Sequence, residues 1–139
     1  MTWTYYQCNG LLISEDQETT LHCYSGIDEG KNNPDMQGVI EKGPIPEGMY
    51  TAQEPFASDT HGPFAMRLEP DPGNDMLGRS AFMYHADSIN HPGRASNGCI
   101  VSMGTNKVSG RQEREWFWSS GDHRIKVQSG VVAKGERLI

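Results

Sequence analysis

The sequence predicts a mainly β protein with one or two short helices. Three observations support this prediction. Short β-prone runs are separated by polar turn segments, 16 glycines and 8 prolines fall among 139 residues, and only one segment is a credible helix. Glycine and proline interrupt regular structure and mark turns. A chain of this length is the size of one domain and can bury its own core, so we expect residues 1–139 to form a single domain.

The N-terminal segment WTYYQCNGLLISEDQETTLHCYSG has β-prone runs on both sides of a polar SEDQET tip. This pattern predicts a hairpin in which TLHCYSG is the returning strand. The following segment, GIDEGKNNPDMQG, is dense in glycine, asparagine, aspartate and proline, and we expect this composition to exclude regular structure. Loops of such length in compact domains are often functional.

Further strands are expected in the middle and near the end of the chain. One begins near Met49, another spans residues 64–68, and SAFMYHADS begins as an apolar strand. GCIVSMG is a short apolar run with Cys99 at its entrance, and HRIKVQS alternates as a half-buried strand does. One helix is predicted over about residues 106–119, despite Gly110 near its start.

Charge and hydropathy limit the function classes. The formal net charge is -6 and lysine and arginine form no cluster, which makes nucleic acid a poor candidate partner. No run approaches the roughly 18 apolar residues of a membrane span. The start, MTWTYYQCNG, lacks the basic and apolar regions of a signal peptide, so we expect synthesis in the cytoplasm and, if the protein is exported, some other route.

The three cysteines are an odd number with no CxxC pair. Cys8 and Cys23 flank the expected hairpin and could form a disulfide in an oxidising compartment, leaving Cys99 unpaired. The alternative is that both are buried small hydrophobic residues. The sequence leaves the two possibilities open.

The segment YHADSINHPGRASNGCIV, residues 84–101, contains the side chains best suited to catalysis. A catalytic cysteine needs a base or a positive environment to form its thiolate, and donors for the oxyanion formed on attack. Gly98 gives the backbone freedom, and the amides around Asn97 to Cys99 could face a developing negative charge. His85 ends one apolar strand and Cys99 begins another, so a hairpin-like connection could bring imidazole and thiol together.

Alternatives exist for the base and for its orientation. His91 is the rival base, although a loop histidine is more often a surface residue or a substrate contact. The other nitrogen of His85 could be held by Asp87 or Ser88, or equally well by a backbone carbonyl. The remaining histidines have no comparable sequence neighbours and are taken as ordinary residues: His22, His61 and His123.

Three segments resemble a known family. His85 followed by Ser96, Asn97, Gly98 and Cys99 resembles the active-site signature of the L,D-transpeptidases, the YkuD-type catalytic domain, in which a histidine precedes a Ser/Thr-x-Gly-Cys element. YSGIDEGKNNP, GPIPEGMY and HADSINHPGRASNGCI resemble, in that order, the branch of this fold found as antibacterial effectors of type VI secretion systems. Together they are spread over much of the first 101 residues, from position 24 to position 100.

The resemblance implies a YkuD-like β-sandwich or barrel that acts on peptidoglycan stem peptides without a metal or cofactor. Cys99, deprotonated with help from His85, would attack the diaminopimelate carbonyl before the terminal D-alanine of a tetrapeptide. Water would then hydrolyse the thioester, or a free D-amino acid would capture it. Classical members have histidine at the position of Asn97 and a longer spacing, which makes cross-linking to a second stem less expected than cleavage.

The resemblance also implies roles for the neighbouring residues. Amides near Gly98 and Cys99 would form the oxyanion hole, and Ser96 would stabilise the turn or the thiolate. Arg94 could meet a substrate carboxylate or be a solvated loop charge. A loop around residues 31–33 could cover the cleft as a lid or receive a partner. The other substrate-side candidates are Asn97, His91, Asp87 and Tyr84, of which the tyrosine is more typical of a core residue.

Two competing functions stay open at this point. A zinc site built from His85, His91 and Cys99, with Asp87 as a further ligand, would make a metallohydrolase, although these spacings are not standard. An inactive relative would only bind cell wall or a partner protein, but the nucleophile and base are both present. If the protein is a type VI effector, it acts in the target-cell periplasm, and a cognate immunity protein that occludes the Cys99 cleft is the expected partner.

Overall fold

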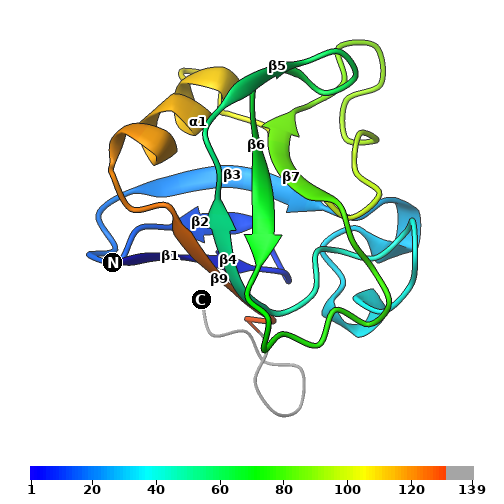
Figure 1. The fold of residues 1–139 in the computed structure, drawn as a ribbon. Helices are drawn as coiled ribbons and strands as arrows, with labels where there is room; N and C mark the ends of the chain where they lie inside the picture. The colour runs from blue at the N-terminus through cyan, green and yellow to red at the C-terminus, as the bar shows by residue number, and fades with distance from the viewer. Residues whose placement is uncertain (131–139) are drawn as a thin grey trace.

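The computed structural model describes residues 1–130 (Figure 1). This part of the chain contains one α-helix, α1 (Gly110–Ser119), and two short 3-10 turns, Asp28–Gly30 and Pro34–Met36. Its strands are β1 (Thr2–Tyr6), β2 (Leu11–Ile13), β3 (Thr20–Ser25), β4 (Gly48–Ala52), β5 (Phe56–Ser58), β6 (Gly62–Pro70), β7 (Phe82–Ala86), β8 (Ile100–Ser102) and β9 (Arg124–Gln128). The mainly β prediction with short helical elements is confirmed.

The strands close into a barrel. The order of hydrogen-bonded neighbours is β4-β9-β1-β2-β3-β8-β7-β6, and β6 pairs back with β4. β5 pairs with β6 and lies outside this ring of eight. Closure leaves no unpaired sheet edge in the ring, which explains how strands of only three to nine residues form a stable sheet.

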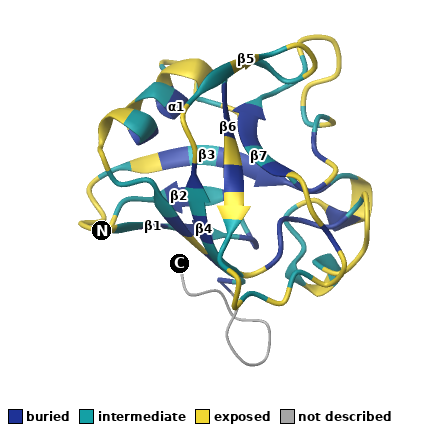
Figure 2. Ribbon diagram, in the orientation of Figure 1, coloured by how far each residue is buried: buried dark blue, intermediate teal, exposed yellow. Residues whose placement is uncertain are grey.

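The core lies inside the barrel and under α1 (Figure 2). Ile125 and Val127 of β9 point inward and are buried, as the alternating HRIKVQS pattern predicts. Phe117 of α1 is fully buried, and its ring meets Trp3 and Tyr84 edge-on at centroid distances of 5.4 and 5.6 Å. These aromatic contacts attach the helix to the sheet.

The N-terminal segment is a three-stranded meander rather than the expected hairpin. β1 pairs antiparallel with β2, and β2 pairs antiparallel with β3. The chain turns at Gly10, where φ is +74° and a Cβ would collide with the carbonyl of Cys23, so a side chain is excluded. Cys8 and Cys23 are both buried free thiols, which agrees with their interpretation as small hydrophobic residues.

The helix begins later than the predicted position 106. The Thr105 hydroxyl accepts hydrogen bonds from the amides of Lys107 and Val108, which holds this stretch in a turn. Ser109 then caps the helix by accepting from the Gln112 amide at 3.1 Å. Within residues 1–130 no helix has the length and apolar character needed to cross a membrane.

The segment of residues 26–38 is also more ordered than its composition predicts. It contains both 3-10 turns, and the side chain of Asn33 caps the second by accepting from the Asp35 amide, with Pro34 at the first position. The prediction that this segment has no regular structure is wrong at these two turns.

Candidate active site

β7 and β8 bring the two central candidates to one face of the sheet. The strands run parallel, with Tyr84 opposite Ile100 and His85 opposite Val101. The connection between them is therefore a crossover and not the hairpin-like link expected from the sequence. Because alternate residues share a face, Tyr84 and Ile100 point into the core, while His85 and Cys99 lie diagonally on the opposite face.

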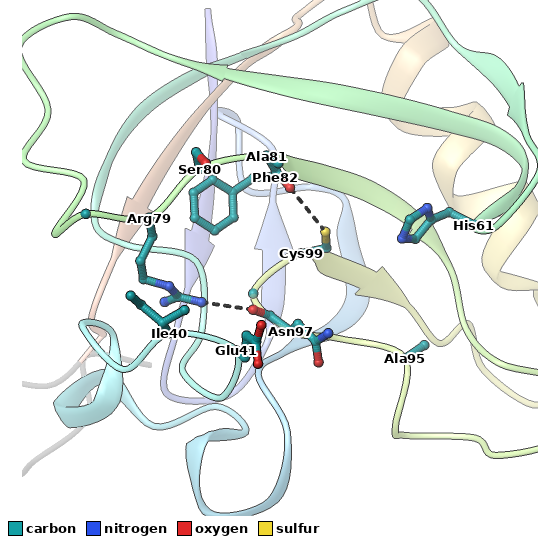
Figure 3. Close-up of a pocket in the computed structure, with 12 residues that line it drawn as sticks. Ile40, Glu41, His61, Arg79, Ser80, Ala81, Phe82, Ala95, Asn97 and Cys99 are labelled. Carbon is teal, nitrogen blue, oxygen red and sulfur yellow. Dashed lines mark hydrogen bonds between the residues drawn. The ribbon is translucent and has the colours of Figure 1, made fainter.

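Cys99 lies just before β8, in the wall of a hollow of about 400 Å³ (Figure 3). The hollow is also lined by residues 40–41 and 78–82, by Ala95, Asn97 and Gly98, and by His61. The thiol lies 4.0 Å from the Ala81 carbonyl. Burial raises the pKa of the Cys99 thiol, whereas a hydrogen bond from the Met83 amide and the charge of Arg79 lower that pKa. A half-buried thiol with a raised pKa is protonated at pH 7 until a base removes the proton.

His85 is the buried base candidate, with only 1% of its surface exposed. Its Nδ1 lies 2.7 Å from the Ala86 carbonyl, so Nδ1 carries the proton and Nε2 has a free lone pair. That Nε2 is buried and has no hydrogen-bond partner. Of the alternatives for orienting His85, the structure shows the backbone carbonyl.

The pKa of His85 is lowered to about 4, mainly by burial. The hydrogen bond to the Ala86 carbonyl opposes this shift, whereas the nearby His61 and Arg114 add to it and Asp87 has the smallest, opposite effect. The ring is therefore neutral at pH 7. A neutral imidazole with an unoccupied nitrogen on the same sheet face as a thiol can act as a general base.

His61 is a residue that the sequence interpretation took as ordinary. It lies in the turn between β5 and β6, and its ring centroid is 4.5 Å from that of His85. Its Nδ1 is 2.8 Å from the Thr60 hydroxyl. Figure 3 shows its ring at the side of the hollow that holds Cys99. A second hollow, lined by His85, adjoins the first and shares His61 and Ala95 with it.

Ser96 builds the turn before the cysteine. Its hydroxyl accepts hydrogen bonds from the amides of Gly26 (2.8 Å) and Gly98 (3.1 Å) and donates to the carbonyl of Cys99 (2.7 Å). Of its two expected roles, stabilisation of the turn is therefore the one observed. Because the Gly98 amide is engaged by Ser96, it is not a free donor for an oxyanion in this state, which differs from the expectation for Gly98.

Arg79 is the second residue that the sequence interpretation missed. Arg79 is 7% exposed, and its guanidinium makes four hydrogen bonds to main-chain carbonyls. Nη1 donates to Gln37 (2.6 Å) and Pro44 (2.7 Å), and Nη2 donates to Gly43 (3.0 Å) and Asn97 (3.0 Å). Figure 3 shows the bond that joins it to the turn before Cys99. Nothing in the local sequence around Arg79 signals this contact, because its partners come from distant loops.

The remaining substrate-side candidates fall into two groups. The Asn97 side chain lies at the Cys99 hollow, and Arg94 lines the hollow beside His85 while its Nη1 forms a 2.9 Å ion pair with Asp28. By contrast, Tyr84 is fully buried in the core, and His91 is exposed and lines neither hollow. Tyr84 is thus a core residue and not a substrate contact.

Asp87 orders the connection between β7 and β8. Its carboxylate accepts hydrogen bonds from the Tyr24 hydroxyl (2.7 Å) and from the amides of Ser88 (2.8 Å) and Gly93 (3.1 Å). The Tyr24 hydroxyl in turn accepts from the Ala95 amide at 2.9 Å. Asp87 therefore holds the loop that returns the chain to Cys99.

Residues 31–33 pack beside this loop rather than over the cleft. The Lys31 ammonium lies 4.6 Å from the centre of the Tyr24 ring, and Asn32 exchanges hydrogen bonds with Ser25. None of the three lines the Cys99 hollow, whose outer wall is formed by Ile40 and Glu41 instead.

Residues 19–114 match the family model of the Tlde1 domain, which spans the segment from β3 to α1 and includes the Cys99 turn. The chain belongs to the Tlde1 domain family. This family consists of L,D-transpeptidase-like domains of type VI effectors, so the resemblance seen in the sequence is confirmed.

A solved structure supports the same fold for this Tlde1 domain. The crystal structure of the L,D-transpeptidase from Xylanimonas cellulosilytica DSM 15894 superposes with a TM-score of 0.50 at 16% sequence identity. The alignment covers 91% of this chain and 59% of that one, so this chain spans well under two thirds of the other. None of the curated proteins matches the chain.

The geometry does not support the zinc alternative for this Tlde1 domain. Within the described part of the chain, no three or more histidine, cysteine, aspartate or glutamate side chains gather closely enough to hold a metal ion. His85, His91 and Cys99 are therefore not arranged as a zinc site, and His91 is exposed and lines neither hollow.

Proposed function

We propose that this Tlde1 domain is a cysteine enzyme that cleaves the L,D bond of peptidoglycan tetrapeptide stems through a thioester on Cys99. The observation that supports it best is the state of His85. A buried, neutral imidazole presents an unpartnered Nε2 on the sheet face that also bears a thiol in the wall of a hollow. A buried polar atom without a partner is costly, and such atoms are often retained for catalysis.

The first step is attack with proton transfer. His85 Nε2 takes the Cys99 proton as the sulfur attacks the carbonyl of diaminopimelate, because neither group is charged beforehand at pH 7. The imidazolium then gives the proton to the amine of the departing D-alanine. The C–N bond breaks, and the acyl group stays on sulfur as a thioester.

The oxyanion formed on attack needs a donor close to Cys99. Since the Gly98 amide is held by Ser96, we assign this role to the main-chain amide of Cys99 itself. One donor of this type typically contributes about 3 kcal/mol to lowering the barrier.

The second step is release of the acyl group. Water yields the shortened stem, which is L,D-carboxypeptidase activity, and a free D-amino acid yields exchange. Transfer to a second stem is less favoured, because Asn97 stands where classical members of the family have histidine. Either outcome would deprive cell-wall synthesis of its normal donor, as expected of an effector that a type VI system delivers to the target-cell periplasm.

An immunity protein that occludes the cleft is the partner implied by this role. The rim of the hollow offers Ile40, which is 63% exposed, next to Glu41, and a partner with an apolar contact and a basic neighbour would fit it.

The test is incubation of the purified protein with tetrapeptide-stem muropeptides and mass spectrometry of the products. We expect a product lighter than the substrate by the mass of D-alanine less one water, because hydrolysis adds water as D-alanine leaves. Cys99→Ala and His85→Ala should give no such product. Cys8→Ala removes a thiol that lines neither hollow and should keep the activity. Products that persist in Cys99→Ala would refute the thioester route, and no product from the unsubstituted protein would favour a binding module.

A further inference from the structure

Arg79 is a buried cation without a carboxylate partner. Among residues 1–130 it takes part in no ion pair, and its hydrogen bonds go only to the carbonyls of Gln37, Gly43, Pro44 and Asn97. Burial of an unpaired charge is unfavourable, and these four bonds offset it only in part, which agrees with the lowered pKa of the guanidinium. A cation retained at such a cost needs an explanation beyond packing.

The position of the guanidinium is defined by the cysteine turn. It occupies the space where a side chain at position 98 would lie, so that any Cβ on Gly98 would collide with Nη2. Gly98 also has φ of +135°, a conformation that favours glycine. The guanidinium also lies 5.5 Å from the centre of the Phe82 ring. Arg79 is thus enclosed between β7 and the residues that directly precede Cys99.

The same side chain also fixes the opposite wall of the hollow. Three of its four bonds go to residues 37–44, the segment that supplies Ile40 and Glu41 to the rim. A planar guanidinium can bind carbonyls in several directions at once, whereas a lysine ammonium has three donors on one atom. Only arginine can therefore join both walls and the turn in this geometry.

Three ionisable side chains, those of Arg79, Glu41 and His61, line the hollow that holds Cys99, and His85 lies on the same sheet face as the thiol. Arg79 comes from the segment before β7, Glu41 from the loop of residues 37–44, His61 from the β5–β6 turn and His85 from β7. His85 is neutral at pH 7, and Glu41 is an exposed carboxylate that would oppose a thiolate. Arg79 is the one group among them that is positively charged over the whole range in which a thiol titrates.

We propose that Arg79 is a positioning residue for Cys99 that joins residues 37–44 to the Asn97–Gly98 turn and stabilises the thiolate by its charge. This inference rests on the proposed function, since it assumes that Cys99 is the nucleophile. Classical members of the family have histidine at the position of Asn97, and asparagine cannot carry a positive charge. Arg79, from another loop, would supply that charge near the thiolate.

The direct test is the rate of alkylation of Cys99 by iodoacetamide as a function of pH, located by peptide mass spectrometry. The proteins compared are the unsubstituted chain, Arg79→Met, Arg79→Lys and the control Arg124→Met. Arg124 also makes several hydrogen bonds, to Thr51 and Asp71, but lies away from both hollows. Near-ultraviolet circular dichroism establishes that each variant is folded.

We expect the alkylation midpoint of Arg79→Met to rise by about one pH unit, and that of Arg124→Met to stay at the parent value. The alkylation midpoint of Arg79→Lys should stay close to the parent value, because the positive charge remains. Its kcat should fall about tenfold with little change in KM, because the ammonium lacks the planar set of donors that joins the loop to the turn. A folded Arg79→Met with the parent midpoint would overturn the proposal. If Arg79→Met does not fold, Arg79→Lys decides, and a lysine variant with parent kcat would overturn it.

This experiment separates the inference from the proposed function. Alkylation needs no peptidoglycan, so a wrong substrate would leave the shift in Arg79→Met intact while the unsubstituted protein gives no cleavage product. Conversely, the unsubstituted protein could cleave the substrate through Cys99 while Arg79→Met shows the parent alkylation midpoint. That result would support the proposed function and reject the role of Arg79.

Discussion

The imidazole of His61 lies against that of His85, with ring centroids 4.5 Å apart and planes inclined by 59°. One ring is buried and the other reaches the hollow that holds Cys99. A positive charge on His61 disfavours a proton on His85, which contributes to the lowered pKa of His85. This pair therefore links the protonation of the base to the surface of the cleft.

The first prediction concerns this pair. His61→Ala removes a neighbouring charge and admits water to His85, and both changes raise the pKa of His85 from its low value. The acid limb of the kcat/KM profile, which reports the free enzyme, should move to higher pH. His61→Phe keeps the packing and removes only the charge, so its shift should be smaller. An acid limb at the parent position in both variants would show that the two rings are not coupled.

The second prediction concerns stability against acid. His85 has a pKa of about 4 in the folded protein and an ordinary value near 6.5 when unfolded. Above about pH 6.5 both states are neutral and this contribution is complete, whereas between pH 6.5 and 4 the unfolded state binds more protons and stability falls. The full loss is on the order of 3 kcal/mol. Urea unfolding should show a steeper decline over this range in the parent than in His85→Gln, and equal slopes would contradict the burial of a neutral histidine.

The third prediction concerns the Ser96 hydroxyl. Ser96→Ala leaves the buried amides of Gly26 and Gly98 without a partner, which should lower the free energy of unfolding by about 2–4 kcal/mol and reduce kcat. Ser88→Ala is the control, because its hydroxyl accepts one hydrogen bond from the His91 amide in an exposed loop. Denaturant midpoints that fall equally in the two variants would contradict the structural role of Ser96.

These predictions depend on contacts of two kinds, and only one kind could be read from the sequence. The strands at β4, β7 and β9 follow from local alternation and turn residues, and Cys99 at the entrance of β8 follows from its own neighbours. Those features are set by residues close together in the chain.

The contacts that the sequence analysis did not predict join residues that are far apart in the chain. Parallel pairing of β7 with β8 depends on closure of the whole barrel, and a local pattern favours a hairpin. His61 reaches His85 because β6 pairs with β7, and Arg79 reaches Asn97 because loops of residues 37–44 and 95–99 meet at one end of the barrel. Neither histidine nor arginine carries a sequence signal of its distant partners.

The fourth prediction compares two glycines. Gly98→Ala places a Cβ against the Arg79 guanidinium in a backbone conformation that favours glycine, so we expect a lower melting temperature and loss of activity. Gly73→Ala has no heavy atom within 4 Å of its Cβ and should change neither. Thermal melts and the muropeptide assay check both, and a fully active, equally stable Gly98→Ala would show that the turn tolerates a side chain.

The central claim is that catalysis passes through a thioester on Cys99. The most direct measurement is release of D-alanine from a tetrapeptide-stem muropeptide, combined with the intact mass of the protein quenched in acid during turnover. The account predicts release of D-alanine together with an adduct on Cys99 of the substrate mass less D-alanine, and neither in folded Cys99→Ala. Undiminished release of D-alanine by Cys99→Ala would contradict it.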